Sequence, residues 1–347
     1  MLNRVQSVVA CGMVGGVRTL LATLSALLLV PVLAGIAHAY DKIAEAAPVT
    51  MVESPGGEGE VRARLVLGTV TAGTSHNLRS EIEVGDGRVD GAVSAIAIGH
   101  KITCQPVGGT TLPNTATQHG QIWSGQNLLH GGGRVTLVVR MLFKPATTGN
   151  YECLLRAYVL DGYAAGQPGQ PGRETARLYS GFIGDIDGAI DPEGFAQTFG
   201  SSQNTFLGMD APGKQVNPVD YTPLPGATRF LATTDLFATS CYGNGGNACP
   251  DGTTYPGKAN TAMVRFRTVA TPSSAAPGCV AQATPSETAA VSGNLHHLRL
   301  LGQLTVTQPA SGCGTWRINA FVQDNGGTLP FVIHGNPYSV TYARPPV

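Results

Sequence analysis

Charged side chains are scarce in this 347-residue chain: they make up 13% of it, against roughly 25% in an average soluble domain. Neither sign dominates, because 22 Lys and Arg stand against 22 Asp and Glu. The sequence therefore lacks the basic field that a nucleic-acid-binding protein needs, and we expect no nucleic-acid partner. Glycine and proline are frequent, with 46 and 23 residues, but stay below the share that is typical of disordered chains.

Several motifs for catalysis and metal binding are also missing. The chain has no C-x-x-C pair of a thiolate zinc site, no G-x-S-x-G nucleophile elbow, no H-E-x-x-H and no Walker-type phosphate loop. His296 and His297 are adjacent, so on a strand they would point to opposite faces and would not share one metal ion. Paired carboxylates leave no local signature, so a hydrolase that uses carboxylates stays open as an alternative.

The sequence contains one long uncharged run, from Leu20 to Ala39. Arg4 and Arg18 precede it, and Ala37-His38-Ala39 closes it as a signal-peptidase site would. A run of this length is also long enough to span a membrane. We expect a signal peptide that is cleaved after Ala39, which makes the mature chain a secreted, bacterial-type protein without a membrane span.

The cysteines agree with secretion. One of the seven, Cys11, lies in the expected signal peptide. The six that remain are an even number, which in a secreted chain predicts disulfides. They are Cys104, Cys153, Cys241, Cys249, Cys279 and Cys313.

The hydrophobic pattern of the mature chain has a period of two. Leu78, Ile82 and Val84 alternate with charged residues, and the stretches 96–104 and 135–143 alternate in the same way. We find no sustained 3.6-residue stripe. The pattern therefore predicts an all-β protein built of sandwich domains.

The chain also resembles itself at an offset of 163 residues. The alternating apolar residues of 135–143 match those of 298–306, and LLRAYVLDG (154–162) matches RINAFVQDN (317–325). Tyr179 likewise matches Tyr342. Because a slip of one residue would expose every core side chain, the shared phase favours an internal duplication over chance similarity.

These patterns predict two tandem β-sandwich domains. We expect the following division of the chain: signal peptide 1–39, flexible leader 40–57, first sandwich 58–183, an acidic and Pro/Gly-rich linker 184–221, and second sandwich 222–347.

The segment Thr147-Thr148-Gly149-Asn150-Tyr151-Glu152-Cys153 resembles the D-x-G-x-Y-x-C signature of immunoglobulin-like domains, with Thr147 in place of the usual Asp. The resemblance covers about 50 residues of the first repeat and implies an immunoglobulin-like sandwich. It also implies that Tyr151 anchors a corner and that Cys153 bonds across the sandwich to Cys104. In the second repeat Trp316 stands at the place of Cys153, where we expect it to fill the core.

The second repeat needs different disulfides. Cys241 and Cys249 bracket a short loop, and Cys279 is within reach of Cys313. Six cysteines allow many pairings, so this connectivity is a hypothesis.

One acidic run is a candidate for an ion site. Asp185, Asp187, Asp191 and Glu193 surround a glycine turn at the expected junction of the two domains. Calcium takes six to eight oxygen ligands from such loops, although the run is not an EF-hand and also fits a solvated turn. Calcium is the one cofactor that the sequence suggests.

Loops rich in Gly, Asn and Tyr are candidates for recognition. They are the segment 118–133 with Trp123 and the bracketed loop with Tyr242, Asn244 and Asn247. We expect a non-catalytic protein for binding, adhesion or surface display, whose partner is an extracellular ligand or surface component that the sequence does not name. A carboxylate-dependent hydrolase and an extracellular coat protein are the alternatives.

Overall fold

The computed structural model describes residues 40–43, 48–52, 54, 58–86, 95–129, 133–160, 175–200, 203–241, 260–292 and 296–346. Within these ranges the chain is β almost throughout, and the one helical segment is the 3-10 turn η2 (Pro192–Gly194). This part of the chain has no helix that is long and apolar enough to cross a membrane. The expected signal peptide lies outside the described residues.

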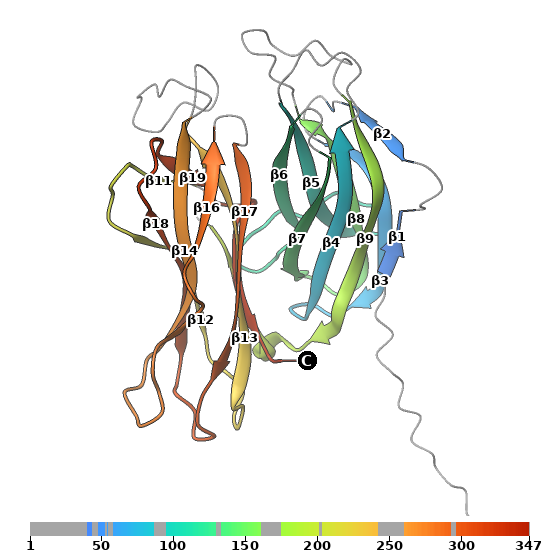
Figure 1. Ribbon diagram of the computed structural model, residues 1–347. Helices are drawn as coiled ribbons and strands as arrows, with labels where there is room; N and C mark the ends of the chain where they lie inside the picture. The colour runs from blue at the N-terminus through green and yellow to red at the C-terminus, as the bar shows by residue number, and fades with distance from the viewer. Residues whose placement is uncertain are drawn as a thin grey trace, which may run out of the picture. The chain divides into compact units, whose positions relative to one another are not determined.

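The first sandwich consists of two antiparallel sheets, drawn in blue to green in Figure 1. One sheet has the order β1-β9-β4-β7, with β2 also paired to β9. Its strands are β1 (Tyr40–Lys42), β2 (Val49–Val52), β4 (Ser75–Asp86), β7 (Arg134–Phe143) and β9 (Thr175–Ile190). The other sheet has the order β3-β8-β5-β6, and its strands are β3 (Glu60–Val70), β5 (Ala95–Pro106), β6 (Gln121–Leu129) and β8 (Gly149–Leu160).

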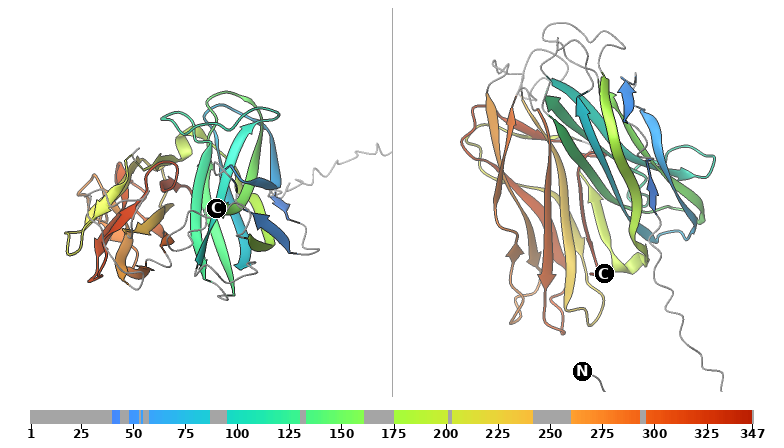
Figure 2. Two further views of the ribbon diagram at one scale, coloured as in Figure 1. Left: turned by 90° about the horizontal axis from the view of Figure 1, so that it is seen from above. Right: turned by 45° about the vertical axis from the view of Figure 1, so that its right-hand side comes forward.

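The second sandwich repeats this plan (Figures 1 and 2). One sheet, which we call the junction sheet, has the order β10-β20-β13-β19-β11, with β17 on the other side of β13. Its strands are β10 (Ala196–Phe199), β11 (Thr205–Leu207), β13 (Arg229–Ser240), β17 (His297–Thr307), β19 (Phe331–Ile333) and β20 (Val340–Arg344).

The other sheet, which we call the outer sheet, has the order β12-β18-β14-β15, with β16 also paired to β14. Its strands are β12 (Lys214–Tyr221), β14 (Thr261–Pro272), β15 (Gln282–Ala283), β16 (Glu287–Ser292) and β18 (Trp316–Asp324).

The strand order is that of a jelly roll. If β1 and β2 count as one interrupted strand, the first sandwich has the orders 1-8-3-6 and 2-7-4-5 in its two sheets. The second sandwich has the same orders if three pairs count as interrupted strands: β10 with β11, β15 with β16, and β19 with β20. An immunoglobulin domain would instead place its first strand beside its second and its last strand beside its sixth. The sandwich class is therefore confirmed, while the strand order is not specifically immunoglobulin-like.

The internal repeat corresponds to equivalent strands of the two jelly rolls. The matched segments at offset 163 lie on β7 and β17, on β8 and β18, and on β9 and β20. Each pair holds the same place in its sheet. The shared phase in the sequence thus reflects a shared topology.

Two segments that we expected to connect domains contribute strands to the sheets. The expected leader contains β1 and β2, which pair with β9. The expected linker contains the end of β9 and all of β10, β11 and β12. The alternation in these segments is too short or too interrupted by Gly and Pro to stand out in the sequence.

Two of the expected disulfides are present, Cys104–Cys153 and Cys279–Cys313. The first does not cross the sandwich, because Cys104 and Cys153 are register partners on the neighbouring strands β5 and β8 of one sheet. Tyr151 does form the expected corner: its hydroxyl donates to the carbonyl of Thr147 at 2.7 Å. The third expected pair, Cys241–Cys249, includes a residue outside the described part.

Trp316 fills the core of the second sandwich, as expected. Its side chain is fully buried and its ring meets that of Phe230 edge-on, with 5.6 Å between the centroids. Its indole nitrogen donates to Oε1 of Gln308 at 2.9 Å, so the polar group is satisfied. The equivalent place in the first sandwich holds Cys153.

Candidate functional site

The outward face of the junction sheet is buried, although it points away from the core of its own sandwich. On β13, Leu236 and Ala238 pack into the second sandwich, so the residues that alternate with them face the other way. Asp235 and Phe237 nevertheless have 1% and 4% of their surface exposed. The edge strands β6 and β7 of the first sandwich cover this face, and we call the region of contact the junction.

Backbone groups on the edge of β7 are satisfied by one side chain from β10. Oε1 of Gln197 accepts from the amide of Leu142, and Nε2 of Gln197 donates to the carbonyl of Leu142, both at 2.7 Å. The same Nε2 lies 2.7 Å from Nδ1 of His119. Because Nε2 is a donor, Nδ1 of His119 is an acceptor and the imidazole is neutral.

The edge of β6 is satisfied in the same manner. The amide of Trp123 donates to the carbonyl of Pro337 at 3.1 Å, and Nη1 of Arg299 donates to the carbonyl of Trp123 at 3.1 Å. Further along, Oδ1 of Asn127 accepts from the amides of His296 and His297 at 2.9 Å each. These contacts leave neither β6 nor β7 as an open sheet edge at these positions.

A buried charge cluster lies inside the junction. Asp235 on β13 pairs with Arg299 on β17 at 2.8 Å, and Arg140 on β7 lies 3.9 Å from the same carboxylate. Burial raises the pKa of Asp235, and the two arginines act against that rise. The cluster couples the two sandwiches, because a carboxylate of the second is held partly by a cation of the first.

Aromatic and imidazole rings gather beside these charges. Phe237 stacks between His297 and Tyr338, with centroids 5.5 Å away in both cases, and His334 lies 5.1 Å from it. Trp123 meets Tyr338 edge-on at 5.6 Å. Burial lowers the pKa of His334 to about 4 and that of His297 well below its usual value. The cluster therefore holds neutral rings and is suited to packing.

Trp123 lies on strand β6, not in a loop as expected, and its ring lies beside a buried lysine. Nζ of Lys101, its register partner on β5, is 4.5 Å from the Trp123 ring centroid and 5.4 Å from that of Tyr158. Burial is the main cause that lowers the pKa of Lys101. The indole thus helps to bury a lysine. The other expected loop residues, Tyr242, Asn244 and Asn247, lie outside the described residues.

The acidic run is split between two different partners. Asp185 contacts Nδ1 of His76 at 2.7 Å, whereas Asp187 pairs with Arg344 of β20 at 2.8 Å. Asp191 and Glu193 are exposed around η2. Across the described ranges, no group of three or more His, Cys, Asp or Glu side chains is arranged to hold a metal ion. The calcium site stays a prediction.

Arg344 takes the place that we expected an ion to fill. It extends from the last strand of the second sandwich to a carboxylate of the first, and only 9% of its side chain is exposed. A cation of the chain itself therefore links the two sandwiches at the acidic run. Arg344, Arg299, Asp235 and Gln197 were not predicted from the sequence. Only Asp235 left a signal there, because it is the one charged residue of β13 besides Arg229.

No protein-family model and no curated protein sequence matches this chain. Among solved structures, the tandem CBM22-1–CBM22-2 domain of Xyn10C from Paenibacillus barcinonensis is 10% identical, with 88% of this chain and 93% of that chain covered and a TM-score of 0.24. A structure of broad bean stain virus is 8% identical, with 88% of each chain covered and a TM-score of 0.25. The VP2 subviral particle of infectious bursal disease virus is 13% identical, with 89% and 76% covered and a TM-score of 0.22. Because all three TM-scores are low, the fold class is defined by the strand order of this chain alone.

Proposed function

We propose that this chain is a secreted, non-catalytic binding protein in which two jelly rolls act as one scaffold. The observation that carries the proposal is the junction, where polar groups of both sandwiches are buried against one another in matched pairs. An interface of this kind holds the binding surfaces on both sandwiches in a fixed relation. The two disulfides suit an oxidising, extracellular environment.

The ends of the strands support the same proposal. In the first sandwich, one end of the sheets contains the last residues of β4, β6 and β8. The same end contains the first residues of β5, β7 and β9. In the second, β13 ends and β17 begins at the corresponding end. Asn127 near the end of β6 bonds to His296 and His297 at the start of β17, so these ends adjoin. Described residues at these strand ends of both sandwiches can therefore contribute to one recognition surface.

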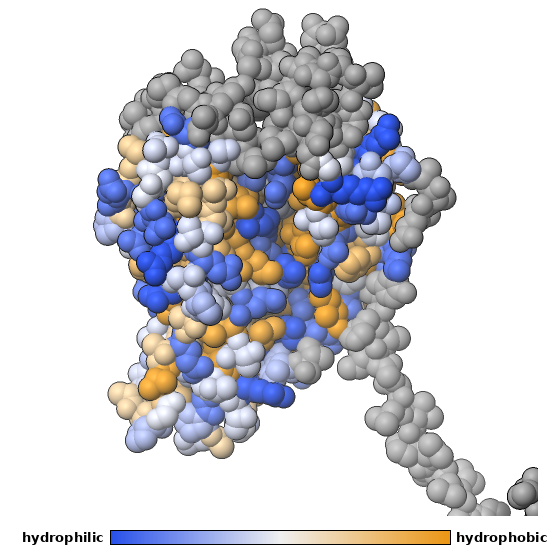
Figure 3. All heavy atoms as spheres, in the orientation of Figure 1, coloured by the Kyte–Doolittle hydropathy of each residue, from blue (hydrophilic) through white to orange (hydrophobic). Residues whose placement is uncertain are grey.

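The surface itself suits polar recognition. On the face drawn in Figure 3, apolar and polar residues are interspersed over both sandwiches. Binding to a hydrated extracellular polymer fits such a surface better than burial in a membrane does.

The proposal is tested with the chain expressed from Tyr40 to Val347. Electrophoresis through gels that contain dissolved extracellular polysaccharides should show retardation in at least one polymer, with no release of reducing ends or free acid. Product release that is lost in the Asp187→Ala variant would favour the hydrolase instead. Unaltered migration in every polymer, together with no binding to bacterial cell surfaces, contradicts a binding function.

A coat protein is the second candidate, because of one observation. Four of the eight large apolar side chains that are exposed in the described ranges are valines on β2 and β3: Val49, Val52, Val61 and Val66. Both strands are outermost in their sheets. Exposed apolar edge strands are surfaces through which chains associate.

Self-association through this edge predicts a concentration-dependent increase in mass. Light scattering should show the increase for the wild type, and Val66→Lys should abolish it. Val280→Lys is the matched control, because Val280 is as exposed as Val66, at 62% against 58%, but lies elsewhere. A constant monomer mass contradicts the coat function.

A further inference from the structure

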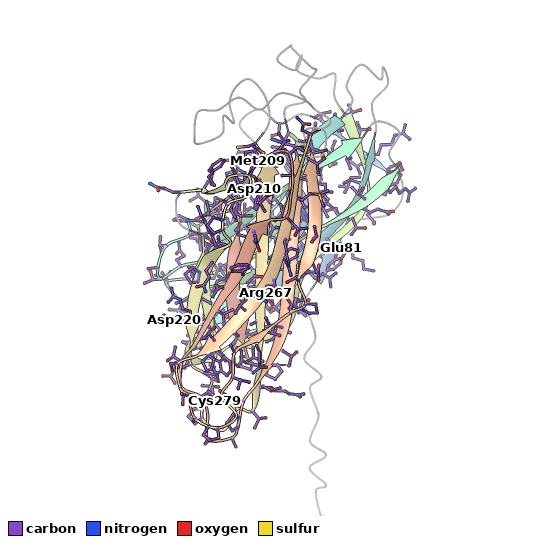
Figure 4. The ribbon with its side chains drawn as sticks, turned by 60° about the vertical axis from the view of Figure 1, so that its left-hand side comes forward. Glu81, Met209, Asp210, Asp220, Arg267 and Cys279 are labelled. Carbon is purple, nitrogen blue, oxygen red and sulfur yellow. A yellow bond between two sulfur atoms is a disulfide. The ribbon has the colours of Figure 1, made fainter. Side chains whose placement is uncertain are left out.

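The outer sheet of the second sandwich carries a face rich in arginine. On β14 and β18 the residues Val264, Phe266 and Val322 pack into the core, so their neighbours point outward. The outward set contains three exposed arginines: Arg265, Arg267 and Arg317. Figure 4 views this side of the chain, with Arg267 and Asp220 labelled. We call this surface the arginine face.

Positive charge is in excess on the arginine face. Arg317 pairs with Asp220 at 3.3 Å, and both side chains are more than half exposed. Neither Arg265 nor Arg267 forms an ion pair with any described residue. Glu287 of β16 is the register partner of Phe266, which places it on the core side. Because the whole chain has a formal net charge of zero, this excess is local.

An aromatic ring lies in the middle of the arginine face. Phe321 is flanked by its register partners Gln215 and Arg267, and the Arg267 guanidinium carbon is 5.3 Å from the ring centroid. A Cβ on Gly213 would lie only 2.1 Å from Cζ of Phe321. Glycine at this position therefore lets the ring lie close against the backbone before β12, where it stays partly exposed.

We propose that the arginine face binds an acidic polysaccharide, with uronate carboxylates held by Arg265 and Arg267 and a sugar ring packed on Phe321. Guanidinium groups bind carboxylates through paired, charge-assisted hydrogen bonds. Residues two apart on a strand point to the same face and are about 6.6 Å apart, so the two arginines can contact separate carboxylates. The inference rests on the proposed binding function and names the class of its ligand.

An acidic polysaccharide fits this face better than a nucleic acid does. Nucleic-acid binding draws on many phosphate contacts, typically made by a continuous basic surface. Among the described residues, the arginine face offers two arginines without an ion-pair partner, no lysine and one ring. A chain without net charge also lacks the long-range field that would steer it to a polyphosphate.

Affinity electrophoresis and calorimetry with polygalacturonate test the proposal, with dextran as the neutral polymer and single-stranded DNA as the alternative polyanion. The chain from Tyr40 to Val347 should bind polygalacturonate and not dextran. Arg265→Ala and Arg267→Ala should each weaken binding about tenfold, as expected for the loss of one charge-assisted contact. Phe321→Leu keeps an apolar side chain but loses the ring, and should weaken polygalacturonate binding several-fold.

Arg134→Ala is the matched control. Arg134 also lies over an aromatic ring, that of Tyr179 at 3.6 Å, but on the first sandwich and beside Glu83. Its loss should leave the affinity unchanged. An equal effect of Arg134→Ala, or binding to DNA in preference to polygalacturonate, overturns the proposal. If the chain binds another polymer and neither Arg265→Ala nor Arg267→Ala changes that binding, this inference is overturned and the binding function stands.

Discussion

Asp235 is the residue on which the junction depends most. Its carboxylate is fully surrounded by protein and is balanced by Arg299 and Arg140. We expect Asp235→Ala to lower the free energy of unfolding by about 3–5 kcal/mol, because it leaves Arg299 buried without a counter-ion. Urea denaturation measures the change.

Asp220→Ala provides the comparison for this prediction. Asp220 also pairs with an arginine, Arg317, but both side chains are largely exposed. Exposed pairs contribute about 0–1 kcal/mol, so this variant should stay close to the wild type. If the two variants lose equal stability, the junction charges are no more important than surface charges.

Asp187 allows a test of the calcium prediction. The calcium site that the sequence suggests predicts a rise in melting temperature when calcium is added, with Arg344 as the competitor for Asp187. Calorimetry should therefore detect tighter calcium binding in Arg344→Ala than in the wild type. No heat and no thermal shift in either protein would rule out a calcium site at this carboxylate, which accepts from Asn77 and pairs with Arg344.

Sequence reasoning at the residue scale succeeded where partners follow a local or familiar pattern. Cys104 and Cys153 could be paired because the corner signature around Tyr151 points to a bridge. Asp187 and Arg344 could not, because residues 157 positions apart meet only through the packing of two sandwiches. Their contact depends on tertiary structure, for which a single sequence carries no signal.

At the scale of elements, strand β7 depends on a side chain from another domain. Gln197 bonds to both backbone groups of Leu142, as a neighbouring strand would. Gln197→Ala should expose the Leu142 amide to exchange and cost about 1–3 kcal/mol, since buried backbone groups lose their partners. Hydrogen exchange measured residue by residue checks this.

Gln215→Ala is the control for the exchange experiment. Gln215 is an exposed glutamine on β12 and should leave the exchange of Leu142 unchanged. Protection of Leu142 that persists in Gln197→Ala would show that another group covers this edge.

The strands themselves could be predicted better than their neighbours. Alternation at Leu78, Ile82 and Val84 correctly predicted a half-buried strand, now β4. Which sheet receives the first and last strands could not be predicted, because local alternation is the same in either sheet. The immunoglobulin signature around Tyr151 identifies a corner and a sandwich, and jelly rolls evidently accommodate both.

The whole molecule should be sensitive to acid. Burial lowers the pKa of His100 to about 3 and that of His119 and His334 to about 4. Each value lies below the 6.5 of a free histidine, so the folded chain takes up these protons less readily than the unfolded chain. Stability is then complete above about pH 6.5 and falls as the pH drops toward 4. Urea denaturation over this range should show the fall.

His119→Asn tests the contribution of one site. An asparagine oxygen can accept from Gln197 but cannot titrate, so this variant should lose less stability between pH 6.5 and pH 4 than the wild type. An unchanged slope would assign the acid sensitivity to the other histidines.

The two repeats contact each other through unlike surfaces: the flat side of one jelly roll meets the strand edges of the other. Such an arrangement is heterologous and not reciprocal, because each sandwich contributes a different surface to the contact. The two sandwiches are therefore not interchangeable at the junction. A first half produced alone would expose the edges of β6 and β7, so it should aggregate through the pairing of these edges.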